Sequence, residues 1–133
     1  MGTFDAIGIA GSGMTVYRTW LDAISDNLAN VSTVRATTDD AFQARYVIAE
    51  SADYGQAAGA RVAGVEFGNA EGRLVYEPDH PLADAEGYVR YPDIDMSSQM
   101  TQLIMAQRGY QANAAVVDRA KETYMAALQI GRG

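Results

Sequence analysis

The last third of the chain predicts one uninterrupted helix that is longer than a compact fold of this size can hold. Residues 96–130 contain no proline and a single glycine, and their apolar residues recur at helical spacing. At 1.5 Å per residue, such a helix is about 50 Å long. The chain has 133 residues, and a compact domain of that length is roughly 36 Å across. Either this helix breaks, or the molecule is elongated and its apolar stripes are covered by other chains.

The apolar residues of this segment fall into rows with a spacing of seven. A further stripe, formed by Val116, Ala120, Ala127 and Ile130, widens the apolar face. A helix that is apolar on two flanks has more than one neighbour. The main row is Met96, Leu103, Tyr110, Val117 and Tyr124, and its expected partner row is Met100, Gln107, Ala114, Lys121 and Leu128.

The start of the chain, residues 1–34, has the same heptad pattern. Gly11-Ser12-Gly13 lies inside its stripe. Because glycine costs about 1 kcal/mol in a helix interior, we expect a weak turn, a kink or a late helix start there. Eight of the eight a and d positions are apolar or small, which is the pattern of a helix that lies along another helix. These positions are Ile7, Ala10, Met14, Tyr17, Leu21, Ile24, Leu28 and Val31.

The middle of the chain, residues 35–95, predicts short strands rather than helices. Residues 42–48 alternate between apolar and polar, residues 61–67 form a second candidate strand, and a turn leads into a third at 73–76. Residues 77–95 hold six acids, one base and all three prolines. Since proline fixes extended backbone, we interpret this acidic segment as an extended arm leading into the last helix.

The expected fold is therefore mainly α with a small β insert. The long terminal helices pack as a coiled-coil-like pair, with a short β hairpin and an extended arm between them. The expected division is 1–34 and 96–133 for the helices of the core and 35–95 for the β-rich insert and acidic arm.

Composition excludes several classes of function. The net charge is -7, and an acidic chain repels phosphate backbones, so no nucleic-acid partner is expected. The chain has no cysteine and one histidine, His80, so disulfides, thiolate metal sites and a three-histidine zinc site are excluded. The first basic residue is Arg18, so the start does not resemble a secretory signal peptide. No cofactor or small-molecule substrate is expected.

A few residues could carry chemistry, and each also has a simpler interpretation. The glycines at 8–13 suggest a nucleotide loop, but their spacing is not that of a dinucleotide fingerprint, and no second βαβ unit follows. Asp93 and Asp95 could bind a cation in an extended segment, although no calcium-type loop surrounds them. Solvated surface is the simpler interpretation for these aspartates, for Asp39-Asp40 and for His80. We expect no catalytic and no metal-binding residue.

Several short motifs, in order along the chain, resemble those of the bacterial flagellar axial proteins. Residues 25–33, SDNLANVST, are similar to the S-x-N-[IL]-A-N-x-x-T pattern near the start of rod and hook proteins. Residues 108–113, RGYQAN, are similar to the R-A-Y-E-A-N pattern of their last helix. The short length and the segments 75–81 and 87–92 resemble the basal-body rod proteins of the proximal-rod type.

This resemblance has departures. Gly109 and Gln111 stand where the family usually has Ala and Glu, and the segment 32–60 matches poorly. Gly109 is either a tolerated variant of that alanine or the mark of a close approach to a neighbouring element. The motif residues carried over from the family are Ser25, Asn27, Leu28, Ala29, Asn30, Arg108, Tyr110 and Asn113.

The resemblance implies a non-enzymatic structural subunit that polymerises through its terminal helices into the axial drive shaft used in motility. It implies other copies of the chain, other rod proteins, the flagellar type III export apparatus and the base ring as partners. It also implies a place in the periplasmic part of the basal body, reached without a cleaved signal. The expected interface residues are Ile7, Met14, Tyr17, Leu21, Ile24, Leu28, Leu103, Tyr110, Val117, Tyr124 and Leu128.

Two alternatives stay open from the sequence. The same stripes would suit a free-standing helical regulatory module that forms a dimer. A small nucleotide-binding enzyme is the other alternative. The tyrosines on the stripes suit an interface and an internal core equally well.

Overall fold

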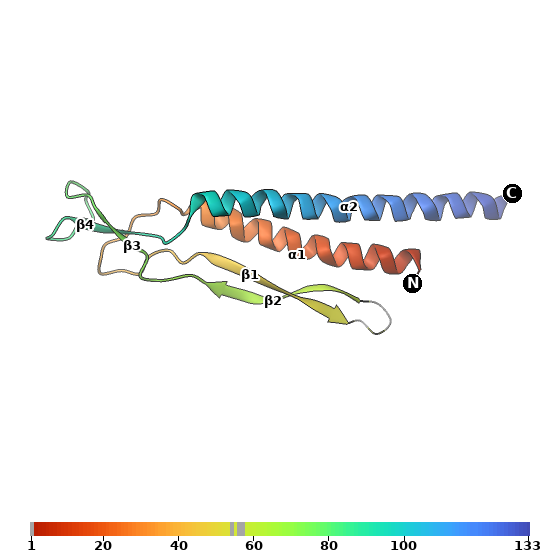
Figure 1. The fold of residues 1–133 in the computed structure, drawn as a ribbon, viewed down its shortest axis with the longest axis horizontal. Coiled ribbons are helices and arrows are strands. Elements are labelled where there is room, and N and C mark those ends of the chain that lie inside the picture. Colours follow the sequence, from red (N-terminus) through yellow and green to blue (C-terminus); the bar gives the residue numbers. More distant parts are fainter. Residues whose placement is uncertain (1, 54, 56–57) are drawn as a thin grey trace.

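Two long antiparallel helices run side by side through most of the molecule (Figure 1). A computed structural model describes residues 2–53, 55 and 58–133. The first helix, α1, spans Thr3–Ala29, and the second, α2, spans Met96–Arg132. Within the described residues, two separate two-stranded sheets lie between them in the sequence. The predicted fold class is confirmed, and α2 is continuous, so the molecule is elongated rather than built around a broken helix.

The expected interruption at Gly11-Ser12-Gly13 is wrong, because α1 passes through these residues without a break. The helix begins after Gly2, whose backbone N–H donates to the Asp5 carboxylate at 3.0 Å. It ends at Asn30, whose backbone N–H bonds to the carbonyls of the preceding turn. Tertiary packing on both sides of α1 offsets the low helix propensity of the two glycines.

The first sheet is an antiparallel hairpin that packs along α1 (Figure 1). Its strands are β1 at Arg45–Asp53 and β2 at Ala58–Phe67. The register shifts at Ile48/Ala49, and such a bulge increases strand twist. The expected strand at 42–48 therefore starts three residues too early and stops five too soon. Residues 41–44 before the strand are irregular chain, and Ala41 and Ala44 are buried there.

The second sheet corrects the interpretation of the acidic segment. It consists of β3 at Arg73–Tyr76 and β4 at Tyr88–Tyr91, which pair antiparallel. The segment is therefore the second half of a hairpin and not a single extended arm. Arg90 anchors it, because its backbone pairs with Arg35 and its guanidinium donates to the carbonyl of Thr37 at 2.8 Å.

The core is thin and lies mainly between α1 and its neighbours. On α2, only Gln99 and Ala106 are buried. They belong to a row that lies one position before the expected partner row. In the expected partner row, Met100 is 46 % exposed and Leu128 is 45 % exposed. Within the chain, contact with the other elements is therefore made mainly by this earlier row rather than by the expected partner row. The buried residues of α1 are Ala10, Val16, Ala23, Ile24 and Asn27.

Candidate assembly interface

Asn27 joins three elements at one end of the helix pair. Its side chain is 1 % exposed. Its amide Nδ2 donates to the Arg45 carbonyl at 3.0 Å and to Gln99 Oε1 at 3.1 Å, and its Oδ1 accepts from the Arg45 backbone N–H at 2.8 Å. One motif residue thus fixes α1, the start of β1 and the first turns of α2. This satisfied polar group sets the register of the three elements, because any slip would leave buried donors and acceptors unpaired.

The neighbouring motif residues shape the end of α1. Arg45 Nη1 also forms an ion pair with Asp26 at 2.7 Å. Asn30 Nδ2 donates to the Asp26 carbonyl at 2.9 Å, and its Oδ1 accepts from the Thr33 hydroxyl at 3.1 Å. Ser25 and Ala29 are exposed on the same turns. In this motif, Asn27 and Asn30 therefore fix the end of the helix, whereas Ser25 and Ala29 leave their side chains exposed.

The Gly-Ser-Gly segment is a packing surface on both sides of α1. The Ser12 hydroxyl donates to the Ile9 carbonyl at 2.7 Å and accepts from the Ala60 backbone N–H at 3.0 Å, which ties β2 to the helix. A Cβ at Gly13 would lie 2.9 Å from Nδ2 of Asn113 on α2. The small residues thus permit close approach, as in tight helix packing, and they form neither a turn nor a nucleotide loop.

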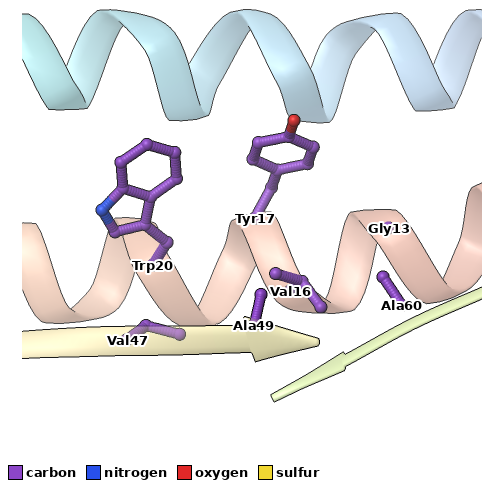
Figure 2. Close-up of a pocket in the computed structure, with 7 residues that line it drawn as sticks. All are labelled: Gly13, Val16, Tyr17, Trp20, Val47, Ala49 and Ala60. Carbon is purple, nitrogen blue, oxygen red and sulfur yellow. The ribbon is translucent and has the colours of Figure 1, made fainter. Parts of the chain in front are cut away.

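Gly109 marks the second close approach between the helices. A Cβ at residue 109 would lie 2.8 Å from Cε2 of Tyr17 and would be closer still to two other atoms of that ring. Figure 2 shows Tyr17 and Trp20 pointing from α1 toward α2. The two rings stack with centroids 6.1 Å apart, and Trp20 Nε1 donates to Gln102 at 3.3 Å. Of the two interpretations of Gly109, the structure favours the close approach.

An apolar cavity of about 330 Å³ lies between α1 and the first hairpin (Figure 2). Among the described residues that line it, only Tyr17 carries a titratable side chain, so these residues offer no catalytic pair. Among the described residues, no group of three or more His, Cys, Asp or Glu is placed to hold a metal ion. The lining residues are Gly13, Val16, Tyr17, Trp20, Val47, Ala49 and Ala60.

Of the other chemical candidates, Asp95 and His80 have structural roles, and Asp39, Asp40 and Asp93 are exposed. The Asp95 carboxylate accepts from the Ser97 backbone N–H at 3.1 Å and so caps the start of α2. His80 Nδ1 accepts from the Leu82 backbone N–H at 3.0 Å inside the β3–β4 loop. Backbone N–H donors, chiefly that of Tyr88, lower the pKa of Asp84, and the hydrogen bond to Glu77 raises the pKa of Tyr91. Within the described chain, no helix is long and apolar enough to cross a membrane.

The expected interface residues fall into three groups. Ile24 is 1 % exposed, so its side chain packs within the chain. Tyr124 and Leu128 are exposed, at 40 % and 45 %. The remaining eight are half-buried along the helix pair, where part of each side chain faces out: Ile7, Met14, Tyr17, Leu21, Leu28, Leu103, Tyr110 and Val117.

Comparison with known proteins decides the family. A model described as "Flagella basal body rod protein" matches residues 7–37, and one described as "Flagellar basal body rod FlgEFG protein C-terminal" matches residues 85–130. The flagellar basal-body rod protein FlgC of Salmonella typhimurium is 36 % identical over 99 % of this chain and all of that protein. The FlgC of Borreliella burgdorferi is 32 % identical over the full length of both. The chain belongs to the FlgC family of flagellar basal-body rod proteins.

The two matched segments of this FlgC-family chain contain all the motif residues described above. The first includes Asn27 and the Gly-Ser-Gly surface, and the second includes Gly109 and Asn113. Sequence reasoning missed Gln99, Ser12 and Trp20, which make the polar contacts between elements. The available signal was a row of small and polar residues at 99, 106, 113 and 120, spaced by seven.

Proposed function

We propose that this chain is a non-enzymatic structural subunit of the proximal rod in the flagellar basal body. The observation that carries this proposal is the match to FlgC proteins over the full length of the chain. The architecture supports it, because two long helices present more apolar surface than one chain of this size covers. Among the described residues, Met96, Ile104, Met105 and Val116 are 46–56 % exposed on α2.

Assembly would bury these stripes against neighbouring subunits. In our division, residues 1–34 and 96–133 build the rod core, and residues 35–95 stiffen it from one side. Burial of apolar surface stabilises by roughly 25 cal/mol per Å², so continuous stripes provide the driving force. Residues 1–31 sum to -2 and residues 96–133 to +2, so contact between unlike helices of adjacent subunits is electrostatically favoured. We propose the half-buried and exposed residues of the predicted set as contacts between subunits.

No observation favours the free-standing regulatory module or the nucleotide-binding enzyme. The Gly-Ser-Gly segment lies inside a helix and packs against β2 and α2. A helix interior has no free N–H groups to bind phosphate. The family is one of structural rod proteins rather than enzymes.

A periplasmic position, contact with the base ring and export by the flagellar type III apparatus are the finer parts of the proposal. They rest on the family relation. The export route has a direct test, a fusion of residues 1–34 to a reporter enzyme. We expect the fusion outside the cytoplasm of flagellated cells and inside it when the export apparatus is deleted. Equal secretion by both strains would contradict this route.

The structural function is tested by exchanging Leu21 in the native host. Leu21 lies midway along the α1 row and is half-buried. Leu21→Glu places a carboxylate where a neighbour would exclude water, which costs several kcal/mol, so isolated basal bodies should lack this variant. Leu21→Met conserves volume and should be incorporated. Complete rods and normal swimming in a strain without the chain would contradict the proposed function.

A further inference from the structure

The second helix continues well past the end of the first. Phe4, in the first turn of α1, meets Tyr124 edge to face with ring centroids 5.2 Å apart. Beyond this contact, α2 continues to Arg132 with no part of α1 beside it, as Figure 1 shows at the C-terminal end. These eight residues cover about 12 Å of helix. We call residues 119–132 the α2 end. This segment comprises the unpaired length and the six residues before it.

The unpaired length of α2 carries several exposed apolar side chains. Leu128 follows Tyr124 by four residues and therefore lies on the same face. Leu128 is 45 % exposed, Met125 is 56 % exposed and Ile130 is 82 % exposed. Met125 and Ile130 lie about 100° and about 120° around the helix from Tyr124. Leu128 therefore continues the face that meets α1, and the other two apolar side chains flank it.

The opposite end of the long axis carries a second exposed apolar cluster. The loop and strand ends at residues 76–88, here called the tip, join β3 to β4 (Figure 1). Tyr76 and Tyr88 meet edge to face at 5.4 Å and are 63 % and 40 % exposed, and Leu82 is 44 % exposed. Asp84 holds the tip in shape, because it accepts from the Tyr88 backbone N–H at 2.8 Å and from the Thr37 hydroxyl at 3.1 Å.

The two clusters have opposite charge. The tip contains four carboxylates, from Glu77, Asp79, Asp84 and Glu86, and no lysine or arginine. The α2 end contains three bases and one acid. Contact between two tips would bring like charges together, whereas contact between a tip and an α2 end pairs unlike charges around an apolar centre. The bases are Arg119, Lys121 and Arg132.

We propose that the tip of a second copy of this chain docks along the side of the α2 end and occupies the line that α1 leaves free. This inference rests on the proposed function and names one contact of the assembly. A two-stranded hairpin is roughly 10 Å wide, which matches the length of unpaired helix. Side-on docking also keeps the acidic tip away from the helix C-terminus, whose carbonyls carry partial negative charge. The contact is heterologous, so it can repeat along a helical assembly.

The test uses single cysteines, since the chain has none of its own. One copy carries Met125→Cys and a second carries Leu82→Cys, both at exposed positions. After treatment with a short bismaleimide, basal bodies isolated from cells with both copies should yield a covalent dimer. The matched control replaces Met125→Cys by Met105→Cys, which is equally exposed at 56 % on the paired part of α2, and should yield little dimer.

Charge provides an independent measurement on the purified full chain. The double variant Lys121→Glu/Arg132→Glu should reduce the yield of the 125–82 dimer about tenfold at low salt. Adding Asp79→Lys/Glu86→Lys to the partner copy should restore the yield. If the yield is not restored, the contact does not depend on pairing between the acidic tip and the basic α2 end, and this part of the proposal is wrong.

The outcomes separate this contact from the function on which it rests. If both cysteine variants are present in basal bodies and the 125–82 dimer is absent, the docking proposal is wrong and the structural function stands. A dominant 125–125 dimer, or a cross-link from residue 82 to a different rod protein, also overturns the second-copy assignment. If the unmodified chain is itself missing from basal bodies, the proposed function fails.

Discussion

At the scale of single residues, the helix pair depends on contacts where a side chain of one helix fills space left by a small or polar residue of the other. Tyr17 lies over Gly109, Asn113 lies over Gly13, and Asn27 bonds to Gln99. Each contact is specific, because the interior is close-packed and a single added methyl group must displace a neighbour. Two of the family-motif residues, Asn27 and Asn113, therefore help to position α1 against α2.

Gly109→Ala should destabilise the chain although alanine favours a helix. The helix gains about 1 kcal/mol, but the new methyl group overlaps the Tyr17 ring, and overpacking costs about 1–3 kcal/mol. The expected loss of about 1 kcal/mol lowers the melting temperature by roughly 3–5 °C. Gly8→Ala is the matched control, since a Cβ there meets nothing within 4 Å, and it should raise the melting temperature. A higher melting temperature for both variants would show that Tyr17 moves aside freely.

Asn27→Asp should be more damaging than its small change in shape suggests. The amide donors to the Arg45 carbonyl and to Gln99 are lost, and a carboxylate replaces them at a buried position. An unpaired buried charge costs several kcal/mol. Burial raises the pKa of such a group, so the loss should grow as pH rises from 4 to 7. Thermal melts at both pH values check this, with Asn69→Asp as the control. Asn69 is exposed and its side-chain oxygen only accepts, from the Glu71 backbone N–H at 2.7 Å, so a carboxylate keeps this bond and should change little.

At the scale of elements, the type of each long segment follows from its periodicity, but the pairing between segments does not. Both helices and the strand at 73–76 are readable from local pattern. The α2 row was misplaced because Gln99 and Asn113 are polar, and their partners Asn27 and Gly13 are far away in the sequence. The β3–β4 pairing was missed because prolines in the loop indicate extended chain without indicating a partner.

The tip should open in acid. Because backbone and hydroxyl donors lower the pKa of Asp84 below its ordinary value of 3.8, its ionised form favours the folded loop. This contribution is fully present above pH 3.8 and is lost as pH falls through the lower folded value. Hydrogen-exchange protection factors of the Tyr88 and Glu86 amides should therefore decrease in that range. Asp84→Asn should remove the pH dependence, and unchanged protection of the unmodified chain in acid would contradict the assignment.

At the scale of the whole molecule, length is the feature that sequence alone conveys best. A proline-free helical segment too long for a compact domain predicted an elongated chain, and α2 spans 37 residues. The arrangement of the ends could not be predicted in the same way. It depends on α1 being ten residues shorter, at 27 residues, and on the register that Asn27 and Phe4 set at either end of the pair.

Removing the apolar side chains of the α2 end should separate folding from assembly. Met125, Leu128 and Ile130 lie beyond the Phe4–Tyr124 contact and are 45–82 % exposed. Their triple replacement by alanine keeps the helix, since alanine has the highest helix propensity. Surface changes of this kind alter stability by about 0.5 kcal/mol or less, so the purified chain should melt almost as before. The same variant should be missing from isolated basal bodies, and its host should not swim.

The control for this variant is Ala126→Ser/Gln129→Ala, which changes exposed residues of the same turns without removing large apolar side chains. It should assemble normally. A large drop in the melting temperature of the triple variant would mean that the α2 end packs within its own chain. Normal incorporation of the triple variant would mean that the exposed apolar side chains of the α2 end have no role in the rod. Only unchanged folding together with lost assembly fits a stripe that a single chain leaves open for its neighbour.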